Sequence, residues 1–392
     1  MPEQHMEKEG IEFSRELVRT PSLSGALSAV ADVVEEKMKA LDFDAVWRDE
    51  AGNVIARKQG HAPGARLLFD AHMDVVQTGS PERWHHPPFG AELSGGRLWG
   101  RGATDTKASL AGMVVGLGRL PRESFRGTLY VTGSLEEETL EGAALAGVLD
   151  AVQPDGVVVG EPTDCRLAIG HKGRCRLVFT FTGRSGHTSS PEKGENAIRK
   201  MALAARRIEE IPLPSDPLLG NGVMEPIIVT SSPNPNASTI PDVCQLIYDR
   251  RLVRGETREA LLAAYRQALA DLPGWSVAYE ELEIGSYTGW AYRAPDFHPA
   301  WAADPDSEWV RLALAGLEQA GLPPVTYTAP YCTNAAVSAG ERGIPSLVFG
   351  PSSIALAHIE DEYIELDELR RGMRGFVGLA QSLGQFGGSC AA

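Results

Sequence analysis

A histidine and several aspartates follow a short apolar run near residue 70. The run Leu67–Phe69 leads into Asp70, His72 and Asp74. Because side chains at positions i and i+2 of an extended chain lie on the same face, His72 and Asp74 should project together. An imidazole with a carboxylate beside it is typical of a metal ligand. The alternative is a histidine that caps a strand, with the aspartates in solvated turns.

Further acidic and imidazole side chains come at the ends of other apolar runs. Asp105 follows the glycine-rich stretch Gly100–Gly102, where the backbone can bend closely around an ion. The other positions are Glu136–Glu138 after the run 129–132, Glu161 after the run 157–159, and His358 after the run 346–349. Each of these alone is as consistent with a solvated helix start or a structural histidine, but their shared placement at strand ends favours one site.

The order of the elements predicts a mostly parallel α/β fold. Strand-like runs alternate with helical patterns, beginning with an amphipathic helix over Leu27–Leu41 and including a helix of small residues over Ala108–Leu117. Such alternation favours a parallel sheet with helices on both faces. Ligands of these folds bind beyond the carboxyl ends of the strands. The candidate residues all lie at those ends.

A second region, residues 174–293, changes character. Its segments follow the order strand, helix, strand, strand, helix, strand: 174–181, 198–208, 226–230, 243–249, 261–269 and 275–282. This order is that of the split βαβ, or ferredoxin-like, sandwich. We therefore predict a domain inserted into the first one, which resumes with a helix over Trp309–Ala320. The predicted domains are 1–173 with 294–392, and the insertion 174–293.

Composition excludes several classes of partner. The 392 residues carry a formal net charge of −15, which disfavours nucleic acid and anionic membranes. The five cysteines are scattered without CxxC spacing, as expected of reduced thiols in a cytoplasmic protein. No signal peptide and no membrane-spanning apolar stretch is expected.

Seven motifs together resemble the co-catalytic zinc amidohydrolases, the family of acetylornithine deacetylase, succinyl-diaminopimelate desuccinylase, aminoacylase and glutamate carboxypeptidase. They are DAHMDVV, WGRGATDTK, LEEETLEG, GEPT, RSGHTSSP, the sites around Asn236 and Asp249-Arg250-Arg251, and GPSSIALAH. The resemblance implies a zinc-peptidase-like sheet with an inserted lid and dimerisation domain. It also implies two zinc ions per subunit, with cobalt or manganese as substitutes.

The resemblance assigns the site residues. It implies that His72, Asp105 and Glu161 hold one zinc and that Asp105, Glu138 and His358 hold the other. It implies that two further residues are catalytic: Glu137 is the general base, and Asp74 forms a hydrogen bond with the second nitrogen of His72. Asn236 and Arg251 would bind the substrate, and His187 would reach the partner's active site across a homodimer. The Asp105-Thr106 peptide is expected to be cis.

The implied function is zinc-dependent hydrolysis of the amide bond of an N-acyl amino acid by an activated water. A carboxypeptidase or dipeptidase of the same family is the alternative, and a non-catalytic binding module is a further one. A dinuclear aminopeptidase or phosphoesterase lacks support, because the inserted domain and the Asn236 and Arg251 motifs are not parts of those patterns. Three positions depart from the family: Glu136 for aspartate, Asn334 for an acid and Ser352 for glycine. We interpret them as affecting substrate fit more than catalysis.

Overall fold

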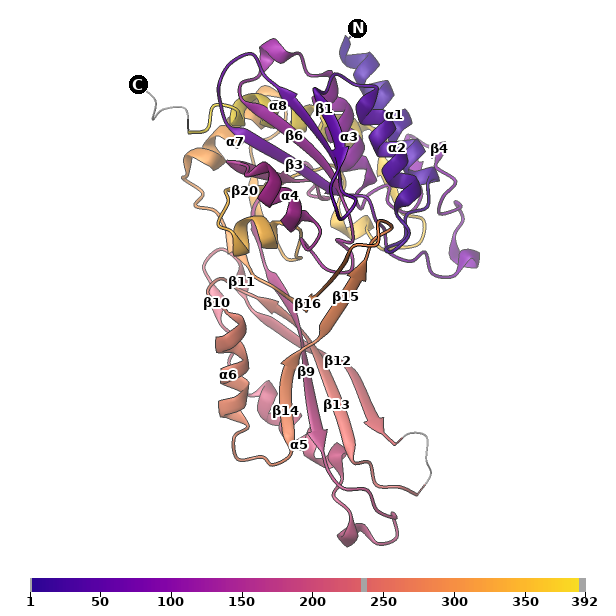
Figure 1. The fold of residues 1–392 in the computed structure, drawn as a ribbon, viewed down its shortest axis with the longest axis vertical. Helices are drawn as coiled ribbons and strands as arrows, with labels where there is room; N and C mark the ends of the chain where they lie inside the picture. Colours follow the sequence, from indigo (N-terminus) through magenta and orange to yellow (C-terminus); the bar gives the residue numbers. More distant parts are fainter. Residues whose placement is uncertain (1, 234–237, 388–392) are drawn as a thin grey trace.

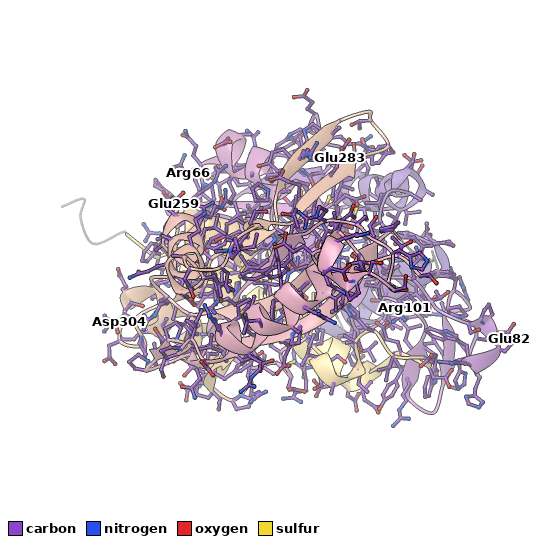
Figure 2. The ribbon with its side chains drawn as sticks, turned by 90° about the horizontal axis from the view of Figure 1, so that it is seen from below. Arg66, Glu82, Arg101, Glu259, Glu283 and Asp304 are labelled. Carbon is purple, nitrogen blue, oxygen red and sulfur yellow. The ribbon has the colours of Figure 1, made fainter. Side chains whose placement is uncertain are left out.

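The computed structural model describes residues 2–233 and 238–387. Figure 1 shows two bodies, a larger one that carries both chain ends and an elongated one that extends from it. Charged side chains such as Glu82 and Asp304 lie around the outside (Figure 2). In the described ranges, no helix is both long enough and apolar enough to span a membrane.

The larger body contains a nine-stranded sheet, in the order β1-β2-β6-β3-β7-β20-β8-β18, with β19 beside β8. The strands are β1 (Ala45–Arg48), β2 (Val54–Gln59), β3 (Arg66–His72), β6 (Thr128–Ser134), β7 (Gly156–Val159), β8 (Leu167–His171), β18 (Trp301–Ala302), β19 (Thr326–Ala329) and β20 (Ser346–Val348). The central strands β6, β3, β7 and β20 are parallel to one another. The mostly parallel sheet is thus confirmed.

Helices cover both faces of this sheet. They are α1 (Pro2–Arg19), α2 (Ser28–Lys39), α3 (Lys107–Arg119), α4 (Leu145–Val152), α7 (Glu308–Gln319) and α8 (Leu366–Leu383). Leu67 and Phe69 of β3 pack with buried residues of α1, α2, α3, α7 and α8. Leu68 points the other way and packs with α4. This is the two-sided burial that an apolar parallel strand requires. Helices α1 and α8 were not predicted.

The elongated body contains a second sheet in the order β12-β13-β9-β14, with β17 beside β9. Its elements are β9 (Gly173–Thr182), α5 (Ala197–Glu209), β12 (Val223–Ser232), β13 (Val243–Leu252), α6 (Arg258–Ala268), β14 (Trp275–Tyr279) and β17 (Phe297–His298). Alternate residues of β9 and β13 are buried, and Phe179, Leu246 and Tyr265 share their core. The predicted order of strands and helices is present.

Short elements complete the chain. They are β4 (Glu92–Ser94), β5 (Arg97–Trp99) and β21 (Tyr363–Glu365) in one small sheet, the pair β10 (Ser215–Asp216) and β11 (Gly220–Asn221), and the hairpin β15 (Glu281–Gly285) and β16 (Ala291–Pro295). Four 3-10 turns lie at Pro81–Arg83, Arg122–Ser124, Pro191–Lys193 and Ile354–Leu356, and a π-helix at Ala336–Glu341. The strand predicted over 275–282 is wrong at its end, because β14 stops at Tyr279 and the chain turns into the hairpin.

The β15–β16 hairpin connects the two bodies (Figure 1). At its tip, the Tyr287 hydroxyl donates to the carbonyl oxygen of Gly52 over 2.6 Å, and the Thr288 hydroxyl donates to that of Glu50 over 2.8 Å. Gly52 has a φ of +99°, and a Cβ there would lie 2.7 Å from the Tyr287 ring. The turn before β2 therefore accepts the hairpin only with glycine at this position.

Replacing Tyr287 by phenylalanine tests this attachment. Tyr287→Phe keeps the ring but leaves the Gly52 carbonyl without its donor, so we expect the free energy of unfolding to fall by about 1 kcal/mol. Urea unfolding measures the change. Tyr292→Phe, at an exposed tyrosine of the same hairpin, is the control and should stay within about 0.5 kcal/mol of wild type. Equal losses in the two variants would contradict the attachment.

Candidate metal centre and active site

The structure brings the five predicted metal ligands together. They come from five places: the end of β3 (His72), the loop before α3 (Asp105), the segments after β6 (Glu138) and β7 (Glu161), and the loop before β21 (His358). Because the parallel strands β3, β6 and β7 all end at the same edge of the sheet, residues distant in sequence meet there. The Asp105-Thr106 peptide is cis, as expected.

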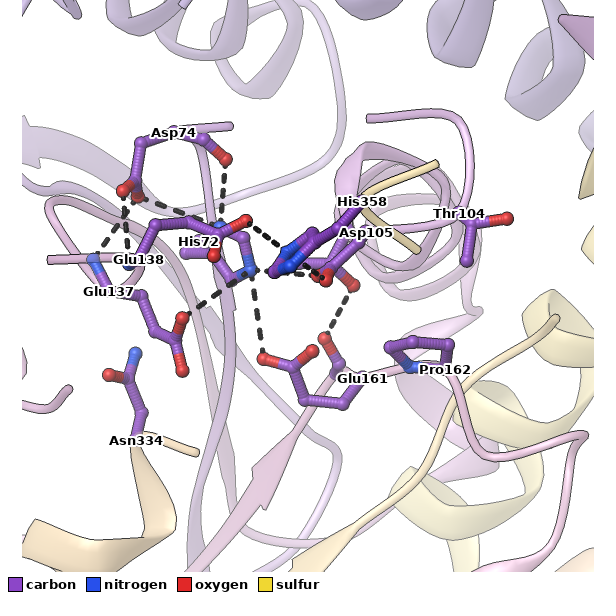
Figure 3. A network of polar contacts seen from close by, with 12 residues as sticks. His72, Asp74, Thr104, Asp105, Glu137, Glu138, Glu161, Pro162, Asn334 and His358 are labelled. Atoms are coloured by element: carbon purple, nitrogen blue, oxygen red, sulfur yellow. Dashed lines mark hydrogen bonds and ion pairs between the residues drawn. The ribbon is translucent and has the colours of Figure 1, made fainter. Parts of the chain in front are cut away.

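Asp105 lies between two imidazoles (Figure 3). Its Oδ1 is 3.2 Å from Nε2 of His72, and its Oδ2 is 3.2 Å from Nε2 of His358. Glu138 Oε1 is also 3.2 Å from Nε2 of His358, and Glu161 Oε1 is 3.8 Å from Nε2 of His72. Ligand atoms therefore form two groups of three, and Asp105 belongs to both.

The chemistry of these atoms fits bound cations. Glu161 Oε1 is buried and has no hydrogen-bond partner among the described residues. Burial raises the pKa of Glu138 to about 7 and that of Glu161 well above its usual value, and the negative charge of Asp105 acts in the same direction. A cation placed between such carboxylates would stabilise their charged forms. Imidazole and carboxylate oxygen are ligands that zinc accepts.

The histidines respond to the same carboxylates. Burial alone would lower the pKa of His72, but hydrogen bonds with Asp105 and Asp74 raise it well above its usual value. Hydrogen bonds with Asp105 and Glu138 raise the pKa of His358 to about 10. Burial disfavours the charged form of Asp105, yet His358 and His72 hold its pKa well below the usual range. The site therefore attracts positive charge, as protons or as a metal.

Asp74 contacts His72 through its main chain and its side chain. Nδ1 of His72 lies 2.9 Å from the main-chain carbonyl oxygen of Asp74 and 3.5 Å from its carboxylate. Since a carbonyl only accepts, Nδ1 carries the proton and Nε2 is free to bind a metal. The Asp74 carboxylate also accepts the Ser24 hydroxyl and the backbone N–H groups of Glu137 and Glu138 over 3.0 to 3.2 Å. Asp74 therefore contacts the second nitrogen of His72 as expected, through its carbonyl oxygen as well as its carboxylate.

Glu137 belongs to neither ligand group. Its Oε2 is 3.9 Å from Nε2 of His72, and its side chain is 9% exposed. Burial raises the pKa of Glu137 well above its usual value, against the opposite effect of His72. A buried carboxylate with a raised pKa, close to the metal ligands but outside their groups, is suited to accept a proton.

The three departures from the family lie outside the cavity lining. Glu136 is 2% exposed rather than solvent-facing, and its Oε1 accepts the Gly25 N–H over 2.6 Å. Ser352 has a φ of +68°, where glycine is usually preferred, and its hydroxyl lies 2.8 Å from that of Thr104. These contacts hold loops beside the ligands, and the effect of the three positions on substrate fit stays a prediction.

Asn334 is bonded to three segments. Its Nδ2 donates to Asp70 Oδ2 over 2.8 Å and to the Ser134 hydroxyl over 3.1 Å, and its Oδ1 accepts the Gly142 N–H over 2.6 Å. Both Asn334 and Asp70 are buried. Asp70 and Asn334 thus form an acid–amide pair, and Asn334 joins the ends of β3 and β6.

A cavity of about 340 Å³ opens beside the ligands. Its lining includes Asp105, Glu137, Glu138, Glu141, Glu161, Arg174, Arg251, Tyr331, Cys332, Ile354, Ala357 and His358. Arg251 is thus placed beside the metal ligands, from the other body. Sequence reasoning missed Glu141, Arg174, Tyr331 and Cys332. Glu141 lies in the LEEETLEG motif, which was the one available signal.

Of the other two predicted residues, one lies outside the described residues and the other is not brought into this cavity. Asn236 lies outside the described residues. His187 follows the far end of β9, whereas Arg174, near the start of β9, lines the cavity (Figure 1). Ten strand residues span about 30 Å. His187 is therefore remote from the cavity of its own chain, and its Nδ1 accepts from the Ser189 hydroxyl over 2.7 Å.

The described residues thus contain two adjacent groups of possible metal ligands, which share Asp105. Residues 68–382 match the peptidase family M20/M25/M40. The chain is 32% identical to the uncharacterized protein YgeY of Escherichia coli K12, over 89% of this chain and 88% of that protein. It is 30% identical to succinyl-diaminopimelate desuccinylase of Maricaulis maris (66% and 70% covered) and 28% identical to acetylornithine deacetylase of Proteus mirabilis (91% and 92%).

Solved structures share the fold. Aminopeptidase PepT from Bacillus cereus superposes with a TM-score of 0.74 at 19% identity, covering 96% of this chain and 98% of that one. The M20 metallo-carboxypeptidase Sso-CP2 from Sulfolobus solfataricus gives 0.73 at 13% identity, covering 96% and 99%. An aminopeptidase therefore has this architecture, so the inserted region does not argue against that activity.

The chain belongs to the peptidase family M20/M25/M40. It is a metal-dependent hydrolase of amide bonds, as the predicted function stated.

Variants of the Asp70–Asn334 pair test whether this buried contact stabilises the protein. Asn334→Asp would place a second carboxylate against buried Asp70, so we expect a loss of about 3 kcal/mol in the free energy of unfolding. The reciprocal double variant Asp70→Asn/Asn334→Asp restores one acid and one amide and should recover most of that loss. Denaturant unfolding of both single variants and the double variant gives the coupling energy, and simple additivity would exclude the pair.

Proposed function

We propose that this protein removes the acyl group from an N-acyl amino acid, using two zinc ions. The observation that supports this most is one cavity that is lined by four of the five predicted ligands, by a buried carboxylate outside the two ligand groups and by Arg251. These are the parts that hydrolysis of an amide next to a carboxylate requires. His72, Asp105 and Glu161 would hold one ion, and Asp105, Glu138 and His358 the other. Cobalt or manganese could replace zinc.

The chain's own residues would manage the protons. Bound metal supplies Lewis acidity, which polarises the scissile carbonyl and lowers the pKa of a water. Glu137 would accept a proton from the attacking water and donate it to the leaving nitrogen. Asp74 would keep Glu137 and Glu138 in register through their backbone N–H groups. The His72 Nδ1–H bond to the Asp74 carbonyl would keep Nε2 directed at the metal.

Arg251 would select the substrate. Its guanidinium can bind a carboxylate through two parallel hydrogen bonds, a geometry that lysine lacks. Its Nε is 3.1 Å from Asp249 Oδ1, and the side chain is 34% exposed, so it is accessible. Asn236 would contribute a hydrogen bond. A C-terminal dipeptide presents the same carboxylate, so a carboxypeptidase or dipeptidase activity is the second candidate.

Assembly forms part of the proposal. Strand β12 is the edge of the second sheet, and it exposes Val223, Ile227, Ile228 and Val229. An unpaired edge with apolar side chains favours association with a second copy. A homodimer formed there would let His187 donate to the oxyanion in the partner's site. We further propose that the protein is cytoplasmic, with residues 174–293 as the lid and dimerisation domain.

Two glutamine variants test the assigned roles. Glu137→Gln should retain metal and lose about a hundred- to ten-thousandfold in kcat, because the proton acceptor is removed. Glu138→Gln should lose metal instead. Elemental analysis and a panel of N-acetyl and N-succinyl amino acids and dipeptides measure both effects. The reverse pattern would show that the two roles are exchanged, and a wild type without metal or activity would refute the proposed function.

Mixing two inactive variants tests action in trans. His187→Ala removes the oxyanion donor, and Glu137→Gln removes the base. In a hybrid dimer, one active site would receive an intact copy of each, so we expect activity to return to roughly a quarter of wild type or less after subunit exchange. Each variant carried through the same exchange alone is the control. Demonstrated exchange without recovered activity, or an active monomer, would rule out the trans role.

A further inference from the structure

The two bodies meet at a buried cluster of charged residues, here called the junction cluster: Glu141, Arg174, Asp296 and His298. Glu141 belongs to the larger body, three residues after Glu138. The other three belong to β9 or to the segment that returns from the hairpin. The chain crosses between bodies at two places, between β8 and β9 and between β17 and β18. Since His298 pairs with Arg174 across β17 and β9, the cluster lies at both crossings.

Glu141 contacts both crossing segments with one carboxylate oxygen. Its Oε2 is 2.7 Å from Nη2 of Arg174 and 3.2 Å from Nε2 of His298. Asp296 closes the cluster, with its Oδ1 at 3.2 Å from Arg174 and 3.1 Å from His298. The side chains of Glu141 and Arg174 are 11% and 13% exposed. His298 and Arg174 hold the pKa of Glu141 near 2 although burial opposes this, so Glu141 is ionised.

The junction cluster restricts the orientation of its side chains more than it adds to the stability of the fold. Taking charges out of water costs free energy that offsets much of their attraction, so a buried ion pair adds little net stability. A guanidinium held by two carboxylates is nevertheless restricted in orientation, because its donors form a planar fork. Glu141 therefore fixes the direction in which Arg174 leaves β9.

Arg174 is in turn the direct neighbour of Arg251. The two residues are opposite each other in the antiparallel pair β9–β13, and both line the cavity. Opposite side chains have Cβ atoms about 5 Å apart, and like charges at such positions repel. Glu141 and Asp296 compensate Arg174, while Asp249 lies beside Arg251. The position of Arg251 thus depends on the compensation of Arg174.

We propose that Glu141 is a positioning residue that sets the placement of Arg251 relative to Glu137, acting through Arg174 at the junction of the two bodies. Glu141 is four residues from Glu137, so one loop carries both the base and the residue that orients the opposite body. The inference rests on the proposed function only for its kinetic test. Its structural test concerns the arrangement of the two bodies and is independent of activity.

Two matched variants separate the effect of the charge of Glu141 from the effect of its side-chain length. Glu141→Gln keeps the shape and removes the charge, whereas Glu141→Asp keeps the charge and shortens the side chain by one methylene. The control is Glu341→Gln. Glu341 also pairs across the two bodies, with Arg258 at 3.3 Å, but both partners are 41% exposed and neither lines the cavity.

A direct electrostatic effect of Glu141 and an effect on the position of Arg251 would change KM in opposite directions. Removing a negative charge near Arg251 would lower KM for an anionic substrate, whereas displacing Arg251 raises it.

Small-angle scattering of the full-length proteins is the structural test. Both Glu141 variants should differ from wild type in the scattering profile, because the elongated body changes its direction, and Glu341→Gln should superpose on wild type. Glu141 variants that also superpose would overturn the proposal. If the wild type hydrolyses no substrate, the proposed function fails, and this comparison still decides whether Glu141 positions the bodies.

Kinetics with N-acetyl-L-ornithine, or with the best N-acyl amino acid of the panel, is the kinetic test. We expect both Glu141 variants to raise KM by about tenfold, with a smaller effect on kcat and unchanged metal content, since residues of one network couple by about two- to hundredfold. In an Arg251→Lys background the same substitutions should change KM by less than about twofold. Effects that multiply independently, or a lower KM in Glu141→Gln, would overturn the proposal.

Discussion

The repulsion among buried carboxylates is the constraint on which this site depends. Asp105, Glu137, Glu138 and Glu161 are all less than a tenth exposed, and they converge where three parallel strands end. Such a group is unfavourable unless positive charge accompanies it. The two imidazoles supply some of that charge only while protonated, whereas divalent cations supply it and leave Nε2 as a ligand. The ligand geometry and the need for cations are therefore two aspects of one arrangement.

The packing of the larger body holds this group of carboxylates in place. Helix α3 begins directly after the Asp105-Thr106 peptide and is buried along nearly its whole length. Its first residue, Lys107, donates to the carbonyl oxygens of Leu17 and Thr20 over 2.8 Å each, at the end of α1. Asp105 is thus attached to a helix that is itself fixed on several sides. Ligands held this way lose little freedom when a metal binds.

Much of the fold could be predicted from the sequence because its strongest signals are local. Apolar runs such as Val157–Val159 gave the parallel strands, and the rule about strand ends placed the candidate ligands. Helices α1 and α8 were missed for different reasons. The polar start of α1 conceals the apolar stripe of Phe13 and Leu17. Helix α8 contains glycines that lower helix propensity but allow close packing, as Gly378 against Gly316 shows.

The contacts that organise the site could not be read from the sequence, because they depend on partners far along the chain. Asn334 bonds Asp70, 264 positions away, and Glu136 reaches Gly25 across 111 positions. A residue type at one position does not indicate which backbone or side chain it meets. The motif resemblance supplied the ligand set as a hypothesis, and the structure supplied the detail that the His72 bond goes to the Asp74 carbonyl.

The two bodies contribute different residues to the cavity, and this affects which substitutions the enzyme can accept. The residues of both metal groups come from the larger body, whereas Arg174 and Arg251 come from the second one. The proposed function therefore assigns metal binding and substrate recognition to separate packing units, with separate cores. Substitutions within the second core can alter recognition while the ligand geometry persists, because residues that share no partners act independently. The residues of the junction cluster contact both units, so changes there should affect recognition and chemistry together.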